Sequence, residues 1–197
     1  MGQRQYKYIA HSENSNGEEQ SMKQHSEGVA ELMKSFALAN DYAEIYLCCG
    51  LLHDLGKYST GFQKYIRSNG NKEPHARWGA YMALKSKLIN IAFPVIGHHA
   101  GLPNRDAMFE DLEICAKEEN KWKNIQQALE DDDFIIPMCD NSPFDKIGDT
   151  FQKELFIRLL YSALVDADSL DTERHFKKEQ FGTRSSKTLD VDVLLTA

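Results

Sequence analysis

The adjacent residues His53 and Asp54, in the run LLHDLGKY, are the feature of this sequence best suited to chemistry. Residues of the same two types recur along the chain, namely His25 upstream and His75, His98, His99, Asp166 and Asp168 downstream. Imidazole nitrogens combined with a few carboxylate oxygens suit divalent transition metals, and two such ions close together favour the hydrolysis of phosphoesters. The series therefore predicts a metal-dependent phosphodiesterase.

No member of this series is diagnostic alone. A single histidine on an apolar helix face, such as His25, is more often a hydrogen-bonded core residue than a ligand. A His-Asp dipeptide is common, and an aspartate such as Asp166 or Asp168 could be a surface acid. Taken together, these residues indicate a metal site more strongly than any one of them does. Burying several histidines and carboxylates without a metal carries a desolvation cost that is difficult to offset.

The elements that must hold these residues are predicted to be helices. Ser21 to Gln24 has the form of a capping box, and the apolar spacing that follows places His25 on an inward helix face. The next helix is closed by Gly56 and holds His53 and Asp54 in its last turn. Its apolar residues recur at three- and four-residue steps, namely Ile45, Cys48, Cys49, Leu52 and Leu55.

Further helices are predicted downstream. Pro74 opens one that carries His75, and Pro94 opens a short one that runs to His98 and His99. A charged helix is expected over about 106–129, within an irregular region at about 104–150 that we interpret as a variable insertion. Thr150 begins the last helix, with an apolar side formed by Leu155, Phe156, Leu159, Leu160, Ala163 and Leu164. The expected fold is an all-α bundle with a metal site at its centre.

Size and composition favour one soluble domain over residues 1–197. No secretory signal and no apolar run near the roughly 20 residues of a membrane span is present, so a cytoplasmic protein without a membrane partner is expected. The four cysteines form no CxxC motif, which is consistent with a reducing compartment. Residues 177–197 turn polar and end in LDVDVLLTA, which could begin a linker to a further domain.

Charge is unevenly distributed along the chain, whose net charge is −7. Between residues 57 and 87 basic residues predominate, whereas acids predominate between 106 and 133. We interpret the acidic run as a solvated face. The basic run starts at the His-Asp motif itself and indicates a local surface that attracts phosphate, with Lys57, Lys64 and Arg77 as the candidate substrate contacts.

The ordered set resembles the HD phosphohydrolase superfamily, and more closely the HD nuclease domain of the CRISPR-associated helicase–nuclease of type I systems. The likeness extends over most of residues 6–176 and is carried by YIAHSENSNGEEQSMKQHSEGVAEL, LLHDLGKYSTGFQKYI, PHARWGA, VIGHHAGLP and LVDADSLDTE. This resemblance implies an all-helical domain that cleaves single-stranded DNA. It also implies two partners, a helicase in the same parent chain or on another subunit, and an RNA-guided surveillance complex.

The resemblance also implies a division of roles. His25, His53, Asp54 and the late aspartate would hold one metal, and Asp54 would bridge to a second metal held by His75, His98 and His99. Lys57 would contact a phosphate oxygen as a point charge. For the late aspartate, the alanine-aspartate form of the family favours Asp168, and Asp166 is kept as the alternative. His11 is interpreted as structural or substrate-lining, and His175 as exposed.

Several alternatives stay open at this point. One is an HD-type nucleotide phosphohydrolase, and another is a non-catalytic docking domain of the interference complex. A cyclic-dinucleotide enzyme is disfavoured, because the Gly-Tyr-Pro expected after the histidine pair is absent from the segment His98 to Pro103. The expected cofactor is one or two divalent ions, and the donor set accepts manganese, iron, cobalt, nickel or zinc.

Overall fold

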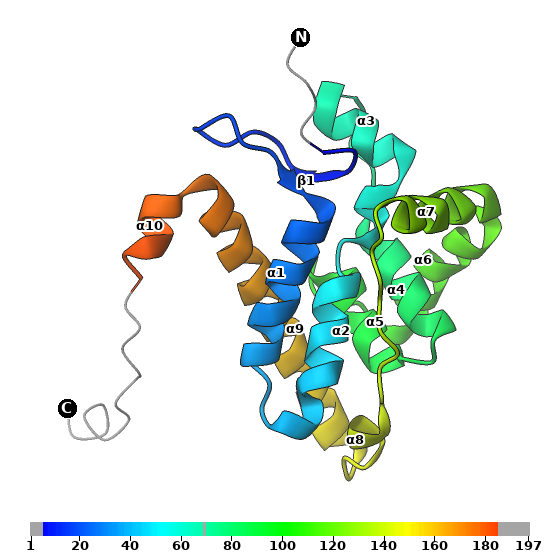
Figure 1. The fold of residues 1–197 in the computed structure, drawn as a ribbon. Coiled ribbons are helices and arrows are strands. Elements are labelled where there is room, and N and C mark those ends of the chain that lie inside the picture. Colours follow the sequence, from blue (N-terminus) through cyan, green and yellow to red (C-terminus); the bar gives the residue numbers. More distant parts are fainter. Residues whose placement is uncertain (1–5, 69, 185–197) are drawn as a thin grey trace.

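A computed structural model describes residues 6–68 and 70–184 of the chain (Figure 1). These residues form ten α-helices, two short 3-10 helices and one two-stranded sheet, so the predicted all-α fold is confirmed. No helix in these ranges combines the length and the apolar character that crossing a membrane requires. The predicted apolar ending, 189–197, and most of the predicted linker lie outside the described residues.

The N-terminal segment forms a small hairpin that leads into the first helix. Strands β1 (Ile9–His11) and β2 (Gln20–Ser21) pair antiparallel. Ser21 then caps α1 (Met22–Ser35), and its hydroxyl oxygen accepts a hydrogen bond from the backbone N–H of Gln24. The Gln24 side chain accepts one in return from the N–H of Ser21, which confirms the predicted capping box.

The most buried helix is α2 (Ala43–Leu52), which follows the 3-10 turn η1 (Asn40–Tyr42) and packs along α1. The two helices approach closely at Gly50, where an added Cβ would lie 2.6 Å from the Cα of Ala30. This contact brings the end of α2 beside the first turns of α1. The helix ends at Leu52, so the predicted placement of His53 and Asp54 in its last turn is wrong by one to two residues.

The next elements carry the chain around the end of α2. They are the 3-10 turn η2 (Leu55–Tyr58), α3 (Thr60–Ser68), α4 (Ala76–Lys85) and α5 (Ile89–Gly97). His75 is the N-cap of α4, so this helix begins two residues after Pro74. Pro94 lies inside α5 and does not open it. Ile91 and Ala92 before it are buried and extend the helix upstream, and the proline removes only one backbone donor.

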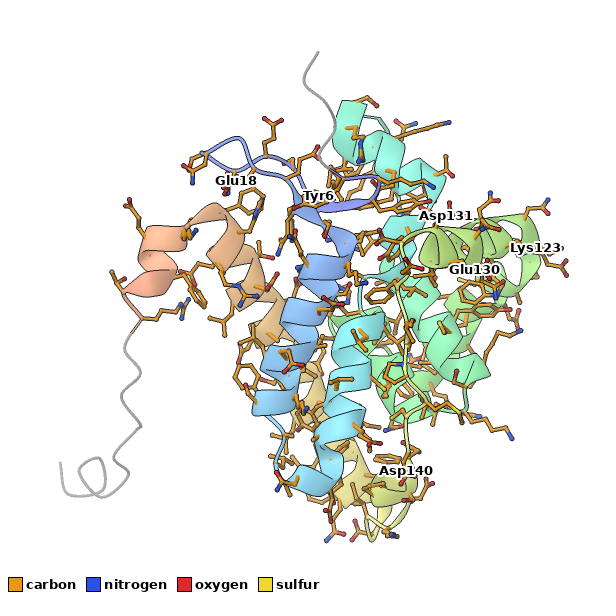
Figure 2. The ribbon with its side chains drawn as sticks, in the orientation of Figure 1. Tyr6, Glu18, Lys123, Glu130, Asp131 and Asp140 are labelled. Carbon is orange, nitrogen blue, oxygen red and sulfur yellow. The ribbon has the colours of Figure 1, made fainter. Side chains whose placement is uncertain are left out.

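The predicted charged helix is two helices, α6 (Arg105–Lys117) and α7 (Glu119–Asp131). Glu118 separates them, because its ψ of 49° is not helical. The chain then runs from Asp131 past α2 to Asp140, next to the short helix α8 (Ser142–Asp145) (Figure 2). The part of the chain predicted to be least regular therefore holds three helices and one extended segment.

The last long helix, α9 (Thr150–Phe176), packs on α1, α2 and α5, and α10 (Lys178–Gly182) follows it (Figure 1). It begins at Thr150 as predicted, with Asp149 as its cap. Leu155 and Leu159 are 47% and 40% exposed, which corrects the predicted apolar side. The buried stripe is narrower and consists of Phe156, Leu160, Leu164, Ala167 and Asp171.

A single methyl group at Gly79 should test how tightly α4 packs on the end of α2. A Cβ at Gly79 would overlap the backbone oxygen of Leu52, which cannot move without shifting the end of α2 just before the His-Asp pair. We expect Gly79→Ala to lower the free energy of unfolding by about 3 kcal/mol in urea titrations. Gly182→Ala is the control, because its Cβ would meet no atom within 4 Å. Equal midpoints for the two variants would contradict this packing.

Candidate metal centre

Two groups of histidine and aspartate side chains meet inside the bundle and share one member, Asp54. The first group consists of His25, His53, Asp54 and Asp168, and the second of Asp54, His75, His98 and His99. In each group, one donor atom from every member lies within 4.8 Å of the others. The donors come from α1, α9 and the ends of α2 and α5, together with the cap of α4, so the fold joins residues 143 positions apart.

The carboxylate of Asp54 lies between the two groups and is wholly buried. Its Oδ2 is 3.3 Å from Nε2 of His25 and 3.2 Å from Nε2 of His53. Its Oδ1 is 3.2 Å from Nε2 of His75 and 3.5 Å from Nε2 of His98. One oxygen therefore faces each histidine group, which is the arrangement that a bridging carboxylate requires.

The outer nitrogens of the buried imidazoles are held by acceptors that fix the tautomer of each ring. Nδ1 of His53 donates to the carbonyl oxygen of Gly50 at 2.7 Å, and Nδ1 of His98 donates to that of Val95 at 2.7 Å. Because a carbonyl only accepts, these Nδ1 atoms carry the hydrogen and leave the Nε2 lone pairs facing inward. Metal-ligating histidines are typically held in this way.

The inward-facing atoms are mostly acceptors that lack donors. Nε2 of His25 lies 3.2 Å from Nε2 of His53, and Nε2 of His75 lies 2.8 Å from Nε2 of His99. Neither oxygen of Asp54 accepts a well-aligned hydrogen bond, although the ammonium of Lys57 is close. Opposed nitrogens in a buried site need either a proton or a metal ion between them. The donor set therefore fits divalent transition metals.

Electrostatics keeps the carboxylates of the site charged. Burial favours the neutral acid, but Lys57 and His53 hold the pKa of Asp54 well below its usual range. Burial lowers the pKa of His25, yet hydrogen bonds to the neighbouring carboxylates, chiefly that of Asp168, outweigh it and raise the pKa to about 9. Burial also lowers the pKa of His53, but the nearby carboxylates, chiefly the charge of Asp54, raise this pKa to about 10. Metal binding would release these protons.

The second group is the more accessible one. His99 is exposed, and the side chain of His75 is 11% exposed, whereas those of His25 and His53 are wholly buried. Partial burial of its ring and the neighbouring His98 lower the pKa of His99 to about 4, so its imidazole is neutral at pH 7. A substrate can therefore approach from the side of His99.

Lys57 is an internal residue and not a surface lysine. Its ammonium nitrogen lies 2.6 Å from Oδ2 of Asp54 and 3.5 Å from the carbonyl oxygen of Ala10. Lys64 is exposed on α3, and Arg77 is half-buried in the first turn of α4. Neither makes an ion pair within the described residues, and contact of all three basic residues with a substrate stays a prediction.

The two late aspartates point in different directions. Oδ1 of Asp168 is 3.4 Å from Nε2 of His25 and 3.8 Å from Nε2 of His53. Asp166 is exposed and belongs to neither group. Residues two apart on an α-helix are about 200° apart around its axis, so only one of the pair can face the centre. The alternative ligand Asp166 is therefore not placed at the site.

Two further histidines border the site without joining either group. The ring of His11 meets the ring edge of His25 at a centroid distance of 4.7 Å. Burial, together with the charge of Lys57, lowers the pKa of His11 to about 3. His175 was predicted to be exposed, which is wrong: it is half-buried, and its Nε2 donates to the carbonyl oxygen of Ser12 at 3.0 Å.

One residue of the site, Asp171, is absent from the sequence prediction. It is completely buried on α9, and its Oδ2 accepts hydrogen bonds from Nδ1 of His25 and from Nε2 of Gln20, both at 2.7 Å. Its other oxygen pairs with the guanidinium of Arg174. A signal existed, since Asp171 follows Asp168 by three residues and so shares its helix face.

Comparison with known proteins agrees with this geometry. A family model described as the HD domain matches residues 22–132, more than half of the chain. The matched range contains every histidine of the two groups together with Asp54, and it ends before Asp168. A search of curated proteins gave no match. HD domains typically act as metal-dependent phosphohydrolases, for which the donors described above are suited. The chain belongs to the HD domain family.

Proposed function

We propose that this HD domain is a metal-dependent nuclease that hydrolyses phosphodiester bonds in single-stranded DNA. The observation that carries the proposal is the shared Asp54 carboxylate, with one oxygen toward each histidine group. His25, His53, Asp54 and Asp168 would hold one ion, and His75, His98 and His99 would hold a second together with Asp54. When bound, such ions supply Lewis-acid chemistry that polarises a phosphoester.

The protein's own groups prepare this site. Asp54 stays ionised, and the Lys57 ammonium next to its Oδ2 fixes the orientation of the carboxylate. The Nδ1 bonds of His53 and His98 hold two imidazoles in one tautomer. Lys57 also holds a positive charge beside Asp54, and a positive charge in a site of low dielectric constant attracts a phosphate more strongly than one in water.

The choice of single-stranded DNA, and of a biological setting, depends on sequence resemblance. LGKYSTGFQ after the His-Asp pair and HHAGLP are the segments most similar to the HD nuclease of type I CRISPR systems. On that basis the protein would act in antiviral interference in the cytoplasm. Its partners would be a helicase, in the same parent chain or on another subunit, and an RNA-guided surveillance complex. The basic residues from Lys57 to Lys87 support a polyanionic substrate.

A cleavage assay with manganese-loaded protein tests this proposal. We expect cutting of a labelled single-stranded oligonucleotide, little release of phosphate from deoxynucleoside triphosphates, and loss of cutting after the metal is removed with a chelator. Cutting should return when a divalent transition metal is added back. Asp166→Ala, which changes an exposed acid outside both groups, is the control variant and should cut like the wild type.

Two other results would each identify a different function. Phosphate release from nucleotides with intact single-stranded DNA would indicate a nucleotide phosphohydrolase. A protein that binds no divalent metal, even at a pH where its imidazoles are neutral, would indicate a docking domain without catalysis.

A further inference from the structure

A groove lies between the end of α5 and the first half of α9. Its volume is about 640 Å³. It is lined by residues of α5, of the loop that follows the histidine pair, and of α9, namely Phe93, Leu102, Pro103, Asn104, Arg105, Thr150, Lys153, Glu154, Ile157 and Arg158. None of these residues belongs to either metal-binding group.

The groove is lined by both apolar and basic side chains. Phe93, Leu102 and Ile157 are half-buried and form the apolar part. Arg105 is exposed and Lys153 is half-buried, and neither makes an ion pair within the described residues.

The other two charged residues of the groove, Arg158 and Glu154, neutralise each other. Arg158 pairs with Glu154, the only acid in the lining, at 2.6 Å. Arg105 and Lys153 lie over aromatic rings, 5.1 Å from the centroid of Phe109 and 5.7 Å from that of Phe144. The groove therefore keeps two uncompensated positive charges on a chain whose net charge is −7.

The loop that follows the exposed His99 lines one part of the groove. Leu102 follows the exposed His99 by three residues in the same loop. That loop folds back onto the end of α5, since a Cβ at Gly97 would lie 3.1 Å from the Cα of Leu102. From there the lining continues along α9 as far as Thr150.

We propose that this groove binds the stretch of single-stranded DNA next to the scissile phosphate. The inference rests on the proposed nuclease function and adds to it a second contact region. Unpaired bases would lie against Phe93, Leu102 and Ile157, while phosphates would pair with Arg105 and Lys153. Proteins hold single strands without reading their sequence by placing apolar side chains beside positively charged ones. The bases of a duplex are paired inside it and would not reach these apolar side chains.

The test compares two double variants that change the net charge equally. Arg105→Glu with Lys153→Glu alters the groove, and Lys34→Glu with Lys123→Glu alters exposed lysines of α1 and α7 (Figure 2 labels Lys123). The substrates are a 20-residue oligothymidine and the small diester bis(p-nitrophenyl) phosphate, with manganese-loaded protein. We expect the groove variant to raise KM for the oligothymidine about tenfold relative to the control, with kcat unchanged.

Two further readouts make the test specific to the groove. Hydrolysis of the small diester should be the same in both variants, because it does not reach beyond the metal centre. In a plot of log KM against the logarithm of the salt concentration, the slope should be smaller by about 1.4 in the groove variant. This is about 0.7 for each of the two lost phosphate contacts. Should the double variant not fold, Arg105→Glu alone, at an exposed position, is expected to raise KM about threefold.

The experiment distinguishes an error in the proposed role of the groove from an error in the proposed nuclease function. Equal KM values for the groove and control variants, with oligothymidine still cut, would overturn the groove alone. A wild-type protein that hydrolyses the small diester but leaves oligothymidine intact would overturn both the groove and the nuclease function.

Discussion

Replacing Asp54 with asparagine should reduce DNA cleavage by a factor on the order of 10³ or more. Asparagine keeps the shape of the side chain but has one acceptor oxygen where aspartate has two. Its NH₂ group would face one of the two histidine groups, or the ammonium of Lys57, in a fully buried position. The single amide oxygen can face only one histidine group at a time, so the bridge between the two metal positions is lost in either orientation.

Metal content and cleavage should be measured together on the same preparations of the Asp54→Asn protein. We expect the amount of bound manganese to fall, while the far-ultraviolet circular dichroism stays that of a helical bundle. Asp166→Asn is the matched control, because it makes the same chemical change at an exposed aspartate outside both groups. Cutting by Asp54→Asn at the wild-type rate would contradict the proposed site and indicate a contaminating nuclease.

The histidines and Asp54 could be found in the sequence because helical periodicity marks inward-facing positions. His25 follows a capping box that the structure contains, and its place on the apolar stripe of α1 was apparent from that spacing. His53 follows a strongly apolar and largely buried helix. Each local pattern needed only a few neighbouring residues. Their grouping around one carboxylate was inferred from family resemblance, since periodicity does not say which helices meet.

Features that depend on distant contacts were not predicted. The role of Asp171 requires Gln20 and His25, which are 151 and 146 positions away in the sequence. The exposure of Leu155 and Leu159 depends on which side of α9 faces its neighbours, and a broad apolar stripe does not fix that. The break at Glu118 lies in a charged segment without proline or glycine, so no residue type marked it.

Asp171 should act as a positioning residue for the first histidine group. It does not reach the centre of the site, but its Oδ2 holds Nδ1 of His25 at 2.7 Å and so leaves Nε2 for a metal. Gln20 and Arg174 hold Asp171 in turn. Carboxylates that orient a ligating histidine in this way typically contribute about 10- to 100-fold in metal affinity.

Asp171→Ala is therefore expected to weaken zinc binding about 10- to 100-fold in calorimetric titrations. Asp171→Asn should retain most of the affinity, because its amide oxygen can accept the same hydrogen bond from His25. Asp166→Ala, an exposed residue of the same helix, is the control and should bind zinc like the wild type. Affinities should be compared at a temperature where every variant is folded.

The tautomer of His25 separates positioning from a purely structural role. In ¹⁵N-labelled, zinc-loaded protein, the wild type and Asp171→Asn should show His25 with its proton on Nδ1. In Asp171→Ala the loss of that acceptor should allow the other tautomer or a mixture of the two. A residue that only supports the fold would lower the melting temperature in both variants and leave the tautomer and the zinc affinity unchanged. Equal loss of affinity in Asp171→Asn and Asp171→Ala would also contradict positioning, because only the alanine variant lacks an acceptor for Nδ1.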